Sequence, residues 1–238
     1  MTNIVILDSK RNRDIKVAFE PRLTPQDGLG HIQVFPSELE AAHKEFPVFF
    51  KKHSGTGQFF LVAILSLQEN GNIFSSDGSW DSRYIPLMSR RGPCMIGRND
   101  GSLSLCVDLN DARVGEQGQR LFDEQGFTTE TAKEVARILS VIHQGKIQSD
   151  HLMDALNAES LIEPISVAYP KGAPLCNLQG LYSINPRKLQ DLQPAPLQQL
   201  NRSGALRSAY LLASSAANLD KLWQGEERMP NADKSSER

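Results

Sequence analysis

The sequence predicts an α+β fold, in which an N-terminal antiparallel β-sheet, curled or barrel-like, is covered by a mainly helical C-terminal half. Residues 46–50 and 59–65 are two apolar runs joined by a polar, glycine-containing link, which is typical of a β-hairpin. Residues 103–109 alternate between apolar and other side chains, as a half-buried strand does. Beyond residue 127, apolar residues recur at helical spacing instead.

The composition is that of a globular protein that can bury a core without disulfides or metals. The chain has 238 residues, of which 39% are hydrophobic and 23% are charged. We expect one domain over residues 1–224, which is β-rich over 1–110 and helix-rich over 127–224. Residues 225–238 are polar and are expected to form a disordered tail.

Charge, cysteines and apolar runs narrow the class of protein. The formal net charge is -2, so we expect neither nucleic acid nor an anionic membrane as a partner. The three cysteines (Cys94, Cys106 and Cys176) lack CxxC spacing, which argues against a disulfide framework and a zinc site. The apolar run at residues 59–67 is too short to span a membrane, and the run at 4–7 is too short for a signal peptide. These features predict a cytoplasmic protein without a cofactor.

The elements of the N-terminal half follow from local patterns. Strands are expected at residues 4–7, 15–19, 31–35, 46–50, 59–65 and 103–109. The first is expected to be buried, and the strand at 59–65 to be central and buried on both faces, because their apolar residues are continuous. A short helix is expected after Pro36, with Ser37 as its N-cap. Turn chemistry marks residues 24–30, Asn70-Gly71 and Asp77-Gly78.

The C-terminal half begins with a charged, glycine-rich stretch over residues 111–126 that is expected to be a surface loop. Capping-box spacing of Thr131 and Glu134 then predicts the start of a helix, and Gly145 predicts its end. The remaining expected elements are a helix at 150–158, a hairpin of strands at 165–169 and 178–184, a break at 194–196, and a final helix at 206–224 in which Tyr210 packs inward.

The strongest candidate site lies in the stretch from Trp80 to Pro93, where aromatic residues, arginines and prolines are dense. Trp80, Tyr84 and one arginine could line a groove for a carboxylate, a phosphate or a peptide strand. Arg90 and Arg91 are adjacent, so in an extended chain only one of them would face that groove. The candidate ligand-binding residues are Trp80, Tyr84, Arg90, Arg91 and Asp77. In the alternative interpretation the aromatics pack the sheet edge, and the arginines pair with acids such as Asp77 or Asp81.

Catalytic and metal-binding patterns are weak. The five histidines (His31, His43, His53, His143 and His151) show no metal-ligand spacing. Cys94 lies near three arginines, which would lower its pKa if it were exposed, although a free cysteine is more often buried. An enzyme would need a site assembled from distant residues such as His31, Asp108 and Arg90.

The order of several short segments resembles the SapC family of bacterial proteins. These segments are Ile4 to Val17, His31 to Glu38, Phe46 to Phe50, Asn72 to Phe74, Trp80, Tyr84 to Pro86, Arg90-Arg91, Leu121 to Gly126, Gly180 to Ile184, Lys188-Leu189, and Gly204 with Leu206, Tyr210 and Ser214. The chain departs from the family at Gly92-Pro93-Cys94 and at Asn185-Pro186, which puts any ligand contact there in doubt. The resemblance implies an association with the bacterial surface layer or with neighbouring envelope and modification proteins, and it implies no catalytic residue.

We therefore expect a non-catalytic, cytoplasmic accessory protein that acts with envelope, surface-layer or protein-modification machinery. Its partner would be another protein of that machinery, and the aromatic–arginine groove would bind a protein segment or a small anionic ligand. The alternative is an enzyme or enzyme subunit. A subunit of the extracellular layer itself is disfavoured, because no signal peptide is expected.

Overall fold

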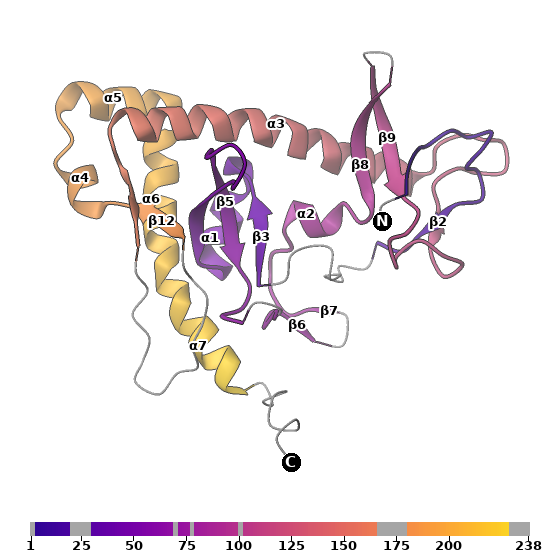
Figure 1. Cartoon of the computed structure of the whole chain (residues 1–238), viewed down its shortest axis with the longest axis horizontal. Coiled ribbons are helices and arrows are strands. Elements are labelled where there is room, and N and C mark those ends of the chain that lie inside the picture. Colours follow the sequence, from indigo (N-terminus) through magenta and orange to yellow (C-terminus); the bar gives the residue numbers. More distant parts are fainter. Residues whose placement is uncertain are drawn as a thin grey trace.

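The computed structural model describes residues 3–19, 30–68, 71–76, 79–99, 102–165 and 180–228. Antiparallel sheets occupy the N-terminal half and helices dominate the C-terminal half, which confirms the α+β class (Figure 1). The sheets are open and do not close into a barrel, so the barrel-like alternative was wrong. None of the described helices is long and apolar enough to cross a lipid bilayer.

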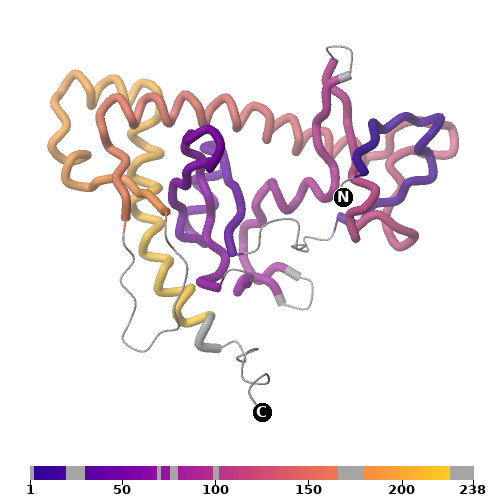
Figure 2. The backbone as a smooth tube through the Cα atoms, in the orientation of Figure 1, coloured from indigo at the N-terminus to yellow at the C-terminus, as the bar shows by residue number. Residues whose placement is uncertain are grey.

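The larger sheet combines both halves of the chain. Its strand order is β11 (Ile162–Pro164), β12 (Leu181–Ile184), β4 (Val48–Lys52), β5 (Phe59–Ile64) and β3 (His31–Val34). The expected β4–β5 hairpin is confirmed, with Phe50 opposite Leu61. β12 confirms the second strand of the expected C-terminal hairpin, but its partner β11 lies before the strand expected at 165–169, of which residues 166–169 lie outside the described residues. β12 pairs directly with β4 beside the N-terminal strands (Figure 2).

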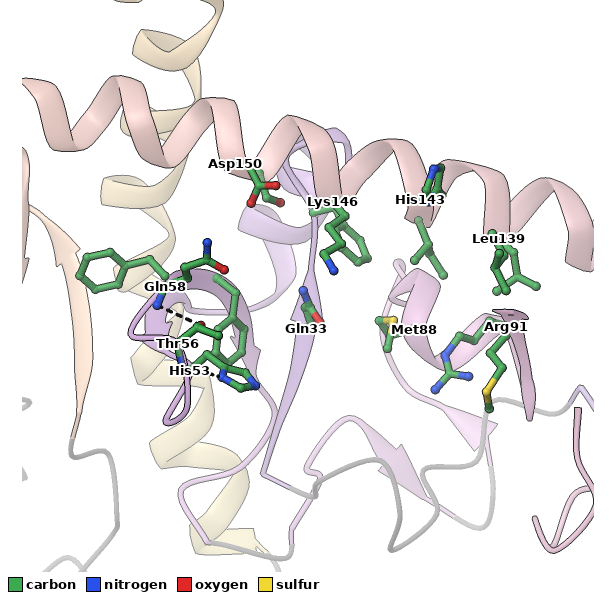
Figure 3. A pocket seen from close by; sticks show the side chains of 17 residues that line it. Gln33, His53, Thr56, Gln58, Met88, Arg91, Leu139, His143, Lys146 and Asp150 are labelled. Carbon is green, nitrogen blue, oxygen red and sulfur yellow. Dashed lines mark hydrogen bonds between the residues drawn. The ribbon is translucent and has the colours of Figure 1, made fainter. Parts of the chain in front are cut away.

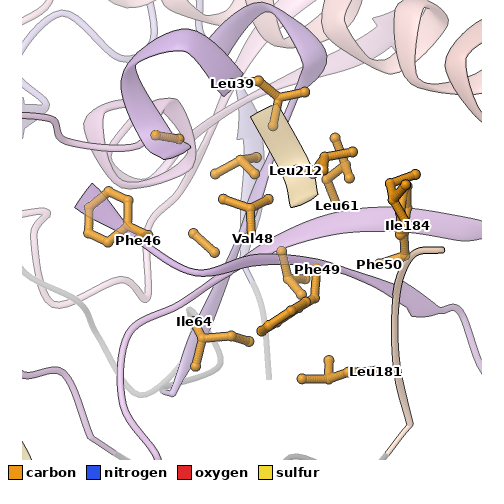
Figure 4. Packing of buried hydrophobic residues seen from close by; sticks show 14 of the residues in the cluster. Leu39, Phe46, Val48, Phe49, Phe50, Leu61, Ile64, Leu181, Ile184 and Leu212 are labelled. Atoms are coloured by element: carbon orange, nitrogen blue, oxygen red, sulfur yellow. The ribbon is translucent and has the colours of Figure 1, made fainter. Parts of the chain in front are cut away.

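The larger hydrophobic core lies between this sheet and helices from both halves. The helices α1 (Leu39–Glu45) and α6 (Ala205–Ser215) pack against each other, and α6 also contacts β4 and β12. Phe46, Phe49 and Phe50 are almost completely buried there (Figure 4). The Phe46 and Phe74 rings meet edge to face with their centroids 4.7 Å apart. Each such phenylalanine contributes on the order of 2–3 kcal/mol by leaving water.

A smaller core lies under the second sheet, whose order is β1 (Ile4–Ile6), β9 (Ser102–Asp108) and β8 (Cys94–Asn99). It contains Val17, Cys94, Val107 and Leu121. The expected strand at 103–109 is confirmed as β9, whereas β8 was not predicted. The expected burial of β1 was wrong, because Ile4 is 51% exposed at the edge of the sheet. Two short ribbons complete the strands: β2 (Lys16–Val17) with β10 (Gln119–Arg120), and β6 (Ser75–Ser76) with β7 (Ser79–Trp80).

One long helix, α3 (Glu130–Ala158), replaces the two helices expected in this region. It begins at Thr129, whose hydroxyl accepts the Ala132 N–H (3.3 Å), and not at the Thr131–Glu134 pair. Gly145 does not end the helix. A Cβ at Gly145 would lie 2.8 Å from the Cβ of Phe35, so this glycine allows close packing. At 1.5 Å per residue the helix is about 44 Å long, and it contributes residues to both cores.

Other local expectations also change. The expected short helix is confirmed as η2 (Pro36–Glu38) followed by α1, but Glu38 and not Ser37 caps it. The predicted break at residues 194–196 is the start of α5 (Pro194–Ser203), since proline fits the first turn of a helix. Tyr210 is 55% exposed and does not pack inward.

The final helix is divided, and part of the expected tail is helical. It consists of α6, η3 (Ala216–Asn218) and α7 (Leu219–Arg228), so residues 225–228 are helical. The two remaining helices are α2 (Leu87–Arg90) and α4 (Pro186–Gln190). The turn predictions at 24–29, Asn70 and Asp77-Gly78, and the tail beyond residue 228, lie outside the described residues.

The stretch at 111–126 is not entirely a surface loop, because Asp111 and Arg113 form a buried ion pair. Arg113 Nε and Nη2 donate to the two carboxylate oxygens of Asp111 at 2.9 and 2.7 Å. Burial alone would raise the pKa of Asp111, but the hydrogen bonds and charge of Arg113 outweigh it and hold that pKa below its usual range. The pair anchors the loop, since the Arg113 carbonyl also accepts the Ala18 N–H at 2.8 Å.

We expect Gly145→Ala to destabilise the protein. Alanine favours the helix by about 1 kcal/mol, but forcing a methyl group against Phe35 costs about 1–3 kcal/mol. Urea denaturation should show a net loss, while Ser140→Ala, at an exposed position of the same helix, should be neutral or stabilising. Equal effects of the two substitutions would contradict the close packing.

We expect Asp111→Asn to lower the unfolding free energy by about 3–5 kcal/mol at neutral pH, because it leaves a buried guanidinium without its counter-charge. Since the folded pKa of Asp111 is depressed, its contribution is present above the unfolded pKa and disappears as the pH falls through the folded pKa. The difference in unfolding free energy between wild type and Asp111→Asn should therefore become smaller at acidic pH. Denaturation of Asp14→Asn, which removes an exposed partner of Arg120, serves as the control and should change by less than about 1 kcal/mol.

Candidate functional site

A groove of about 630 Å³ lies along α3, where this helix passes from the smaller core to the larger one. The β4–β5 hairpin loop, β5, the end of β3, α2 and β8 form its other walls (Figure 3). The lining side chains are Gln33, Phe35, His53, Thr56, Gln58, Phe59, Phe60, Met88, Arg91, Met95, Ile96, Leu139, Ile142, His143, Lys146, Ser149 and Asp150.

One face of α3 supplies a third of this lining. Its residues from Leu139 to Asp150 recur at spacings of three and four, so they form a single stripe on the helix. The stripe is apolar at Leu139 and Ile142 and polar or charged at Lys146 and Asp150. Eleven residues of helical rise give the groove a length of about 16 Å.

The polar groups of the groove are held in place by local hydrogen bonds. His53 Nδ1 accepts the N–H groups of Gly55 and Thr56 at 3.2 and 3.3 Å, which shapes the hairpin loop. On the opposite side, Arg91 Nη1 donates to the Cys94 carbonyl at 2.7 Å and thereby joins α2 to β8. The groove therefore combines an apolar floor with fixed polar groups at both ends, which is the usual composition of a binding site.

The buried carboxylate of Glu38 positions α2 beside the groove. One of its oxygens accepts the Tyr84 hydroxyl (2.7 Å) and the Leu87 N–H (2.9 Å), and the other accepts the Phe35 N–H (2.9 Å). Burial raises the pKa of Glu38, and the three hydrogen bonds together with the charge of Arg90 oppose that rise. Because Leu87 begins α2, Glu38 determines where Met88 and Arg91 enter the groove.

The structure separates the predicted ligand-binding residues. Arg91 lines the groove, whereas Tyr84 binds Glu38 and Arg90 pairs with Glu134 of α3 at 3.3 Å. Trp80 packs edge to face on Phe46, with ring centroids 6.1 Å apart. Asp77 lies outside the described residues. Tyr84 and Arg90 are thus brought together around Glu38, and among the four described residues only Arg91 faces the groove.

The residues considered for a distant catalytic site have separate partners. His31 lies 3.1 Å from Lys51 Nζ, and burial followed by the Lys51 charge lowers its pKa. Asp108 accepts the N–H groups of Asn3 and Asn110, so it shapes a turn. Neither residue lines the groove, nor does Arg90.

The two described thiols, Cys94 and Cys106, are both buried. Cys94 is buried, and burial raises the pKa of its thiol to about 12, so it stays protonated at neutral pH. Within the described ranges no three metal-ligating side chains come together.

Sequence reasoning missed most of the groove. The stripe on α3 was not recognised, because Gly145 was read as a helix end and the stripe continues past it. Its spacing from Leu139 to Asp150 was the signal that could have revealed it. His53 and His143 were considered only as scattered histidines, although both line the groove.

Comparison with known proteins gives one finding. The family model of SapC matches residues 7–222 of the chain. No curated protein and no solved structure matches.

We expect Tyr84→Phe to destabilise the protein by about 1.5–3 kcal/mol at neutral pH, because the buried carboxylate of Glu38 loses a hydrogen bond. This bond favours the ionised form, so its removal raises the already elevated folded pKa of Glu38 further. With a raised folded pKa, stability is fully present below the unfolded pKa and is lost as the pH rises through the folded pKa. The deficit should therefore be largest near neutral pH and shrink towards about pH 4.

Urea denaturation across this pH range measures the effect, with Tyr210→Phe as the exposed control. A deficit that is the same at every pH would mean that the Tyr84 hydroxyl does not act through the Glu38 charge.

Proposed function

Since the chain belongs to the SapC family, we propose that it is a non-catalytic accessory protein of bacterial envelope, surface-layer or protein-modification machinery that binds a segment of a partner protein in its groove. The observation that carries this proposal is the groove itself, with its apolar floor and its fixed polar ends. At about 3.3 Å per extended residue, a groove of about 16 Å accommodates about five residues of a peptide.

The location in the cytoplasm is part of the proposal. The described cysteines, Cys94 and Cys106, are free thiols, which suits a reducing compartment. A partner recognised there would be an envelope or modification protein before export, or a cytoplasmic subunit of the machinery.

A second candidate function, an enzyme, is favoured by one observation. Five titratable side chains line the groove: His53, Arg91, His143, Lys146 and Asp150. Acid–base or nucleophilic catalysis needs two of them within hydrogen-bonding distance. Among the described residues, the side chains of His53, His143, Lys146 and Asp150 form no hydrogen bond with one another, and Lys146 and Asp150 are exposed to solvent. The groove therefore suits binding better than catalysis.

A bulky side chain placed in the groove should prevent the partner protein from binding. Met95 lines the groove and lies outside both hydrophobic cores, so Met95→Trp should block the site without unfolding the protein. Leu103→Trp, at an exposed position of the same hairpin, is the matched control. Tagged wild type and both variants are used to capture proteins from a lysate of the native host, and the captured proteins are quantified by mass spectrometry.

We expect one protein to be captured by wild type and by Leu103→Trp, and its yield to fall about tenfold or more with Met95→Trp, which corresponds to about 1.4 kcal/mol of binding free energy. Circular dichroism must show that the variants are folded. The proposal fails if the groove variant keeps every protein that wild type captures, or if wild type captures none.

A further inference from the structure

The outer edge of β8 has main-chain groups that can accept another strand. β8 ends the sheet β1-β9-β8. The Asp108 N–H donates to the Pro93 carbonyl at 3.2 Å, and this register makes Met95 and Gly97 exchange hydrogen bonds with β9. In an antiparallel ladder the alternate residues, Ile96 and Arg98, therefore direct their N–H and C=O groups away from β9.

This edge is closed at one end and open at the other. The Cys94 N–H donates to the Arg91 carbonyl at 3.3 Å, and the Cys94 carbonyl accepts Arg91 Nη1. Beyond this point, no residue within the described ranges hydrogen-bonds to the outward main chain of Ile96 or Arg98. Unpaired groups of this kind are what a peptide uses when it extends a sheet.

The open part of the edge faces the groove, because Ile96 is one of its lining residues. The sheet packs on the N-terminal part of α3 through the smaller core. A fourth strand beside β8 would continue this packing along α3, over Ile142 and His143, and its inward side chains would occupy the groove.

Charge indicates which segment would fit. Arg98 is exposed beside this edge, Lys146 lines the groove, and neither forms an ion pair with a described residue. Acidic side chains on the incoming strand would complement both cations, whereas basic ones would be repelled.

We propose that the partner segment binds as an added β-strand on the Ile96–Arg98 edge of β8, and that its side chains facing α3 are apolar beside Ile96 and acidic beside Arg98 and Lys146. This inference rests on the proposed function, because it specifies how the groove recognises a protein segment.

The test uses a fluorescein-labelled heptapeptide, Glu-Thr-Ile-Thr-Ile-Thr-Glu, whose glutamates and isoleucines share one face of a strand, and the same peptide with lysine in place of glutamate. Two further versions of the acidic peptide are N-methylated, one at even-numbered and one at odd-numbered amides. In an added strand only one set of amides points at β8, so one methylated peptide should bind like the parent and the other about tenfold more weakly or worse. The lysine peptide should also bind at least about tenfold more weakly. Fluorescence anisotropy measures all four affinities.

Variants of Arg98 separate the main-chain contribution from the charge. The main-chain N–H of Arg98 points away from β9. The substitution Arg98→Pro therefore removes an outward donor without breaking the hydrogen bonds between β8 and β9. Arg98→Ala removes only the side chain. We expect Arg98→Pro to weaken binding of the acidic peptide clearly more than Arg98→Ala does, and the peptide to slow hydrogen exchange at the Ile96 and Arg98 amides of the wild type.

The outcomes distinguish the inference from the proposed function. Equal binding of both methylated peptides, or no binding of the acidic parent, would overturn strand addition, while the Met95→Trp capture experiment would still decide the role of the groove. Equal affinities of the acidic and lysine peptides would overturn the proposed acidic segment. Retention of the host protein by Met95→Trp would overturn the proposed function, whatever the peptides do.

Discussion

The arrangement of the groove depends on a buried carboxylate. Glu38 lies between the end of β3 and the start of α2, and it accepts hydrogen bonds from three residues that lie up to 49 positions away from it in the sequence. A carboxylate removed from water is tolerated only when donors surround it. Because these donors include the first N–H of α2, the interaction that satisfies Glu38 also fixes the wall of the groove.

The groove exists because a single helix, α3, packs against both hydrophobic cores. Leu139 of α3 belongs to the smaller core and Leu152 to the larger one, and the residues between them pass over the gap that separates the cores. Side chains on this part of the stripe, such as His143 and Lys146, face the gap rather than a packed interior. A rigid helix can cross such a gap because its hydrogen bonds are internal.

The elements that depend on neighbouring residues in the sequence could be predicted from hydrophobic patterns. The β4–β5 hairpin and β9 followed from apolar runs and alternation, and the α+β class followed from them. Gly145 misled the prediction, because it is required by a contact with a distant residue, Phe35. The groove combines five or more elements, so only tertiary packing reveals it. The stretch from Trp80 to Pro93 includes Arg91, which lines the groove, but the partnership of Tyr84 with Glu38 could not be read from spacing.

The pairing of β12 with β4 has a consequence for biosynthesis. Residues 48–52 leave the ribosome long before residues 181–184, which complete the sheet beside them. At roughly 5–20 residues per second the nascent chain exposes the apolar edge of β4 for on the order of 10 s. The helix α6, which covers the same core, is made later still. The larger core is therefore completed only after its C-terminal elements have been made, and until then the unfinished edge of β4 is exposed to the pairing with other chains that causes aggregation.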